Sequence, residues 1–183
     1  MNKNNKATQS KKAIEKERVI LSIDGATRTG YAIYKGGAII AHGTKQFTPS
    51  KRVEQYGDWL QQTIGEWQVT EIVTEDIYRE HDHTKDRAFL SLALMQGALR
   101  VITYQNGITP TFLNPLLIKS HMIPSFGRKK CTREENKQRM INRVKGYGYQ
   151  LEHDNTDDEA DAIGILITYL DEYNIPVVHP NRH

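Results

Sequence analysis

The stretch RVILSIDGATRTGYAIYKGGAIIAHGTKQF, residues 18–47, decides the fold. It begins with a short apolar run at 19–23, which is typical of a central strand covered on both faces. Two further strand-like segments flank the pair Gly36-Gly37, which favours a tight hairpin turn. The stretch therefore predicts three antiparallel strands, and Asp24 ends the first of them.

Hydrophobic periodicity and capping signals predict the remaining elements. Apolar residues recur at helical spacing after Ser50, which we expect to cap that helix. Segment 84–105 has the strongest helical pattern, and its apolar circumference is so wide that it must pack in a core or against another subunit. Further strands are expected at 71–75 and 109–113, and further helices begin near Asn114, Thr132 and Thr156.

This order of elements predicts an α/β domain with a mixed five-stranded sheet, three antiparallel strands followed by parallel ones, and helices on both faces. At 183 residues the chain has room for one such domain. We expect a flexible basic arm at 1–17, the folded domain at 18–172 and a C-terminal tail at 173–183.

Composition narrows the class of protein. The sequence has no apolar run near the roughly 20 residues that span a bilayer, and its start has no apolar secretory signal. We therefore expect a cytoplasmic protein without a membrane partner. Cys131 is the only cysteine, so an intrachain disulfide and a Cys-based zinc cluster are excluded. Any metal would fall to carboxylates and histidines, and oxygen ligands favour magnesium or manganese.

Charge is segregated along the chain. The net charge of +3 equals that of the arm, but residues 119–145 carry nine Lys or Arg against two Glu. Residues 150–172 carry eight acids and no Lys or Arg. Cations beside carboxylates suit a phosphodiester substrate whose backbone is held near bound metal. A solvated helix face of mixed charge is the alternative.

Four acids from distant segments stand out. Asp24 and Glu75 end apolar strands, while Asp158 and Asp161 are three residues apart at the start of an apolar helix. A buried, unpaired carboxylate costs several kcal/mol or shifts its pKa upward, so several meeting at one point suggest a divalent cation. Each acid alone is explained as a turn or cap residue. Together they outline a metal-dependent nuclease.

Three motifs carry a family resemblance. The segments IDGATRTGYA (23–32), TEDIY (74–78) and DDEADAIGI (157–165) resemble the active-site motifs of the RuvC family of Holliday junction resolvases, within the RNase H-like superfamily. The resemblance covers about 18–172. It is closer to phage-encoded members, because the loop after Asp24 lacks the usual proline and is one residue shorter. It implies an RNase H-like sheet and an endonuclease that resolves four-way junctions or other branched DNA by paired symmetric nicks.

The resemblance also implies the roles of individual acids. Asp24, Glu75, Asp158 and Asp161 would bind two magnesium ions, for which manganese would substitute, in an in-line displacement. Asp157 competes with its neighbour Asp158 as a ligand.

The DNA contacts implied by the resemblance lie outside the acids. Lys119 would act near the scissile phosphate. Tyr78 would stack on an unpaired base, or else be an ordinary core tyrosine. Lys130 and Lys137 compete for a second position near that phosphate. The basic residues expected to hold DNA are Arg128, Lys129, Lys130 and Lys137. Helix 84–105 would form a homodimer, because symmetric nicks need two sites related by a two-fold axis.

Two other interpretations stay open. The loop DGATRTG also resembles the first phosphate loop of sugar kinases and actin-like ATPases, although those folds need two such domains. A non-catalytic protein that binds branched DNA would be expected to lack one of the acids, and none is missing.

Overall fold

Five strands form one mixed sheet. The structure is a computed structural model, and it describes residues 17–25, 28–78, 86–124, 126–127, 131–151 and 157–181. The sheet order is β3-β2-β1-β4-β5. The first three strands pair antiparallel, and β4 and β5 continue in parallel from β1, which confirms the expected sheet. The strands are β1 (Val19–Asp24), β2 (Arg28–Lys35), β3 (Ala38–Gln46), β4 (Glu71–Glu75) and β5 (Thr111–Leu113).

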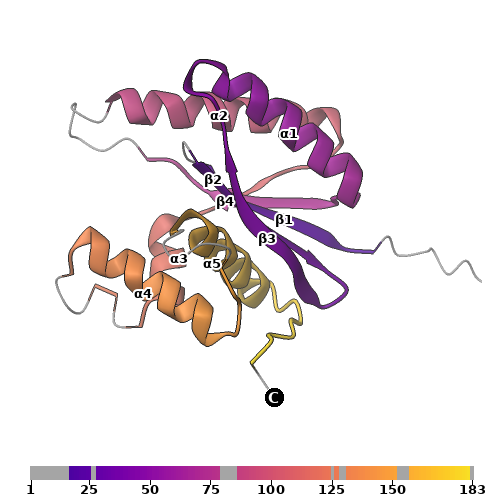
Figure 1. The fold of residues 1–183 in the computed structure, drawn as a ribbon. Coiled ribbons are helices and arrows are strands. Elements are labelled where there is room, and N and C mark those ends of the chain that lie inside the picture. The colour runs from indigo at the N-terminus through magenta and orange to yellow at the C-terminus, as the bar shows by residue number, and fades with distance from the viewer. Residues whose placement is uncertain are drawn as a thin grey trace, which may run out of the picture.

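Helices cover both faces of the sheet, as expected (Figure 1). Helices α1 and α2 pack together on one face, and α3, α4 and α5 pack on the other. They are α1 (Arg52–Trp67), α2 (Asp86–Gln105), α3 (Pro115–Met122), α4 (Arg133–Gly146) and α5 (Asp157–Glu172). A search of the described helices for a stretch both long and apolar enough to span a bilayer finds none.

The central strand β1 is buried on both faces, as its apolar run predicts. Leu21 and Ile23 pack in the core beneath α1 and α2. Ile20 packs in the opposite core with Ile163 of α5. Alternate side chains of a strand point to opposite faces, so one strand serves both cores. Asp24 is the last residue of β1 and lies at the rim of the sheet.

Several turn and cap predictions are confirmed. Gly36 and Gly37 both have positive φ, 59° and 88°, which the tight turn between β2 and β3 requires. The Asn114 side chain accepts a hydrogen bond from the backbone of Leu116 at the start of α3. Thr132 and Glu135 form both bonds of a capping box at the start of α4. The cap expected at Thr156 lies outside the described residues.

The expected cap at Ser50 is wrong. Ser50 lies inside a short 3-10 helix, η1 (Pro49–Lys51), and α1 begins only at Arg52. Proline has a fixed φ that suits the first position of a helix, so Pro49 starts a turn one residue before the serine. Thr48, in an extended conformation, takes the cap position of that turn.

Helix α5 is fixed to the sheet at its first turn. Gly30 of β2 lies directly beside the backbone of Asp158, so closely that a Cβ at position 30 would collide with the Asp158 carbonyl. The Ser22 hydroxyl of β1 donates to the carbonyl of Ala162 at 2.8 Å. Glu159 is fully buried, and its Oε1 lies 2.6 Å from Nδ1 of His42 on β3. These contacts set the first turn of α5 beside Asp24, which pairs with Gly30 across the sheet.

The segment after α5 packs back onto the domain. Ile175 is part of the core, and the backbone of Val178 donates to the carbonyl of Gly37 at 2.8 Å. His179 is buried, and its Nδ1 lies 2.9 Å from the hydroxyl of Tyr149. The described part of the expected C-terminal tail therefore covers the start of β3.

We expect Gly30→Ala to destabilise the protein by about 1–3 kcal/mol or more, because the added methyl group must displace the backbone of α5. The matched control is Gly65→Ala on α1, where a Cβ meets nothing within 4 Å. That substitution should stabilise the helix by about 0.5–1 kcal/mol. Urea unfolding measures both, and a Gly30→Ala protein as stable as the wild type would contradict the close approach.

Candidate metal centre

The predicted acids meet in one cavity. Asp24 and Glu75 are the last residues of the neighbouring strands β1 and β4. These strands run in parallel, so both carboxylates lie at the same end of the sheet, where the carboxyl ends of the strands meet. Asp158 and Asp161 lie on the first two turns of α5, which is fixed against that end. All four, together with Asp157, line a cavity of about 840 Å³. The sequence prediction that these segments converge is thus consistent with the geometry.

Burial raises the pKa values of three of the acids, Asp24, Asp161 and Glu75. Burial raises the pKa of Asp24 well above its ordinary value, and the charges of Asp161 and Glu75 raise it further. Burial and the charge of Glu75 raise the pKa of Asp161 to about 7. Burial also raises the pKa of Glu75, although the charge of Lys119 opposes this shift. A cavity that penalises its own negative charge favours a bound cation.

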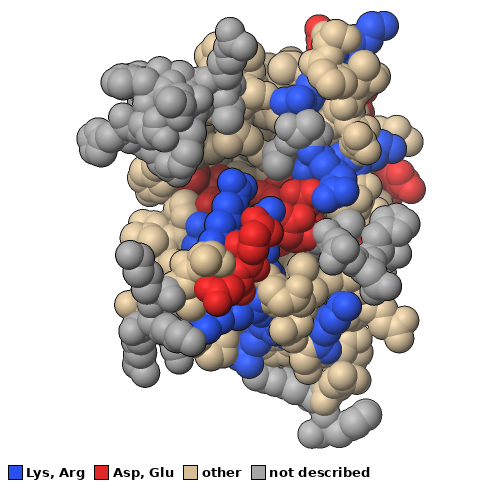
Figure 2. Space-filling view, turned by 60° about the vertical axis from the view of Figure 1, so that its left-hand side comes forward, with Lys and Arg blue, Asp and Glu red and all other residues tan. Residues whose placement is uncertain are grey.

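Basic side chains lie against two of the acids. Nε of Arg28 lies 2.6 Å from Oδ2 of Asp158, and Nη2 of Arg28 lies 3.7 Å from Oδ1 of Asp157. Nζ of Lys137 lies 2.6 Å from Oδ2 of Asp157. Burial would raise the pKa of Asp157, but the bond and charge of Lys137 outweigh it, so the pKa is lowered. Figure 2 shows acidic and basic side chains side by side on one face of the molecule.

The donor chemistry fits magnesium or manganese. The cavity is lined by six carboxylates, the five named above and Asp76, and no cysteine is among its lining residues. Hard divalent ions prefer such oxygen ligands. In the present arrangement, no three His, Cys, Asp or Glu side chains of the described segments are grouped to hold one ion. Asp158 and Asp157 are paired with Arg28 and Lys137. An ion held by either of these two carboxylates would have to displace its basic partner.

Only some of the residues predicted to contact DNA lie in the described part of the structure. Tyr78 lines the cavity with 59% of its surface exposed, which rules out the core tyrosine. Lys119 of α3 and Lys137 of α4 also line the cavity. The other three basic residues, Arg128, Lys129 and Lys130, lie outside the described residues, so the choice between Lys130 and Lys137 stays open.

Several polar residues near the acids were not predicted, and Arg133, Asn136 and Arg28 are among them. Arg133 and Asn136 line the cavity from α4, where they share a helix face with Lys137. Their spacing of three and four residues is a signal that the sequence already contains. Arg28 sits inside the first motif, where it reads as an ordinary loop residue. Its contact with Asp158 joins residues 130 positions apart and leaves no local signal.

Comparisons with known proteins give the fold. No protein-family model matches the sequence, and no curated protein does. Among solved structures, RuvC of T. thermophilus in complex with a Holliday junction substrate is 14% identical, with a TM-score of 0.63 over 86% of this chain and 97% of that one. The yeast mitochondrial Holliday junction resolvase Ydc2 is 16% identical, with a TM-score of 0.58 over 82% and 77%.

A viral protein is similar to the same extent. The fowlpox virus resolvase, solved with Holliday junction DNA, is 13% identical, with a TM-score of 0.56 over 85% of this chain and 98% of that one. Each comparison spans most of both chains, so the likeness extends over most of the fold. The chain therefore has the RNase H-like fold of the RuvC-like Holliday junction resolvases.

Proposed function

We propose that this protein is a metal-dependent endonuclease that resolves four-way or other branched DNA junctions by paired symmetric nicks. The observation that carries the proposal is the convergence of Asp24, Glu75, Asp158 and Asp161 on one cavity with a basic rim. The fold shared with three resolvases supports it. A phosphate-loop role for the first motif would leave Glu75 and Asp161 unexplained.

Each cavity residue has a chemical role in this proposal. The four acids hold the divalent ions, with Asp157 as the alternative to Asp158. When bound, magnesium would supply an activated water and charge stabilisation at the leaving 3′ oxygen. Lys119 is near enough to affect the pKa values of Glu75 and Asp161, so its charge can also offset negative charge developing on the phosphate. Tyr78, exposed at the cavity, offers a stacking surface for an unpaired base.

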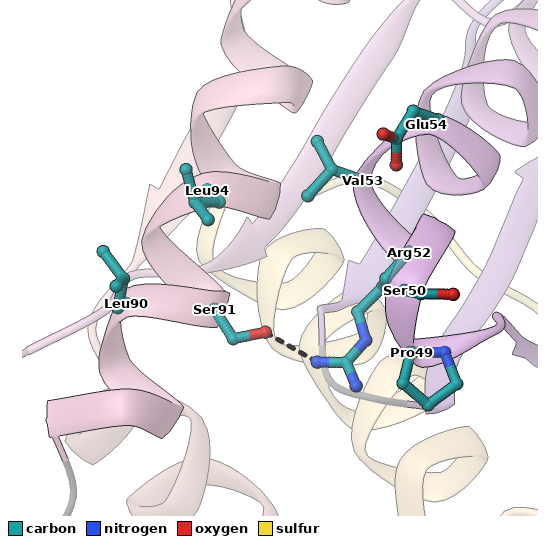
Figure 3. A pocket seen from close by; sticks show the side chains of 8 residues that line it. All are labelled: Pro49, Ser50, Arg52, Val53, Glu54, Leu90, Ser91 and Leu94. Carbon is teal, nitrogen blue, oxygen red and sulfur yellow. Dashed lines mark hydrogen bonds between the residues drawn. The ribbon is translucent and has the colours of Figure 1, made fainter.

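We also propose that α2 forms a homodimer contact. Four large apolar side chains on it are exposed: Leu90, Leu94, Val101 and Tyr104. At 100° per residue they fall within about 80° of the helix circumference, so they form one stripe. At one end Leu90 and Leu94 line an open groove against the start of α1, where Arg52 donates to Ser91 at 2.6 Å (Figure 3). A second copy covering this stripe would pair two cavities by a two-fold axis.

The wild-type protein should nick a synthetic four-way junction at symmetric positions in the presence of magnesium. Asp24→Asn removes one ligand charge without changing shape, so it should bind the junction and fail to cut it. Gel assays with labelled strands measure cutting, and mobility shift measures binding. Equal cutting of linear duplex and junction would contradict the structure-selective activity.

We expect the wild-type protein to sediment as a dimer at micromolar concentration. The double variant Leu94→Glu with Val101→Glu places charge on the α2 stripe and should sediment as a monomer, because buried unpaired carboxylates are costly. Ile40→Glu, on the edge strand β3, is a matched control at another exposed apolar site and should stay dimeric. A monomeric wild type would refute the proposed contact.

Protons should compete with metal in the cavity. Without metal, folded Asp161 keeps a proton up to about pH 7, whereas an unfolded chain loses it near pH 4. This carboxyl therefore lowers stability as pH rises from about 4 to about 7, and its full cost is present above 7. We expect Asp161→Asn to raise the free energy of unfolding by on the order of 1–3 kcal/mol at pH 8.

Urea unfolding in EDTA at several pH values tests this expectation. The stability gain of Asp161→Asn should shrink as the pH falls and be absent near pH 4. A gain that does not vary with pH would mean that the buried charge is not its cause.

A further inference from the structure

Arg28 forms an ion pair with Asp158, one of the acids proposed to bind metal. It begins β2, four residues after Asp24, and its Nε lies 2.6 Å from Oδ2 of Asp158. We infer that Arg28 is an internal counter-ion of Asp158, which competes with the divalent metal and moves to a DNA phosphate when the junction binds. The inference rests on the proposed function for its DNA partner but not for its metal competition.

The contact between Arg28 and Asp158 joins two oppositely charged groups. A guanidinium cannot lose its charge at any pH at which proteins are folded. The pair is charge-assisted and partly shielded, since the Asp158 side chain is only 17% exposed. The hydrogen bond to Asp158 raises the pKa of Arg28 further. While Asp158 is ionised, another cation at Asp158 or another anion at Arg28 would therefore compete directly with this contact.

Arg28 and a metal ion would compete for the carboxylate of Asp158. A divalent ion on Asp158 would lie beside the guanidinium and be repelled by it, because both cations need the same carboxylate. Arg28 also lies 3.7 Å from Asp157, so it faces both candidate ligands on the first turn of α5. Asp158 and Asp157 therefore already face a fixed positive charge when no metal is bound. Arg28 thus weakens metal binding to the DNA-free protein.

The Arg28 side chain could also bind a phosphate group of the DNA. The Arg28 side chain is 42% exposed, and only one of its five N–H donors bonds to Asp158. A planar guanidinium suits the oxygens of a phosphate, which can take two of its donors at once. A phosphate that draws Arg28 away frees Asp158 for metal. Coupling of this kind is reciprocal, so metal and junction should each strengthen the binding of the other.

Calorimetric titration of Mn²⁺ into DNA-free protein tests the competition. Arg28→Gln should bind Mn²⁺ about 5- to 100-fold more tightly than the wild type, the usual range of such couplings. Arg28→Lys keeps a cation and should stay near the wild type. Arg18→Gln is the matched control, because Arg18 is a similarly exposed arginine that pairs with Glu71 at the other end of β1. It should leave Mn²⁺ affinity unchanged.

Weaker or unchanged Mn²⁺ binding by a folded Arg28→Gln protein would overturn the inference, as would an equal gain in Arg28→Lys or Arg18→Gln. Circular dichroism establishes that each variant is folded. Tighter binding by Arg28→Gln alone would support the competition even if no junction were cut, in which case the nuclease proposal fails separately.

Transfer to phosphate is tested by junction binding. Fluorescence anisotropy measures the dissociation constant of a four-way junction with EDTA and with Ca²⁺, a divalent ion that also takes carboxylate ligands. Ca²⁺ should tighten junction binding by the wild type more than 5-fold beyond its effect on Arg28→Gln. An equal effect of Ca²⁺ on both proteins would overturn the transfer.

Discussion

The close approach of α5 to the sheet is the contact on which the candidate site depends. It is a backbone contact, because Gly30 has no side chain to keep the Asp158 carbonyl away. The bond from Ser22 to Ala162 and the contact of His42 with the buried Glu159 hold the same turn from two other strands. Three strands therefore fix one helical turn, and this brings acids of α5 to those at the ends of β1 and β4.

Cations from three separate elements make this crowding of acids tolerable. Arg28 comes from β2, Lys119 from α3 and Lys137 from α4. Two of them form ion pairs with acids of α5, and the charge of Lys119 opposes the upward shift in the pKa values of Glu75 and Asp161. The deepest acids, Asp24 and Asp161, have no such bond among the described residues and carry the largest upward shifts in pKa. The charged forms of these two buried acids therefore destabilise the folded protein, and they are also proposed metal ligands.

Much of the fold follows from local sequence, because apolar runs and caps are local signals. The strands at 19–24 and 71–75 are predictable from short runs of buried residues, and their final acids mark the edge where the cavity lies. Local sequence does not determine which charged side chains pair with each other. The pairing of Arg28 with Asp158 depends on how α5 docks, and so does the need for glycine at position 30. The exposure of Tyr78 likewise depends on the cavity around it.

The segment after α5 has a further consequence for assembly. Val178 forms a bridge with Ala38 and bonds to Gly37, so it occupies backbone groups at the beginning of β3, an edge strand. The opposite edge, β5, has only three residues. Short or covered edges resist pairing with strands of another chain, which is the usual route to aggregates. Pairing of strands between molecules is therefore hindered at β5 and at the beginning of β3.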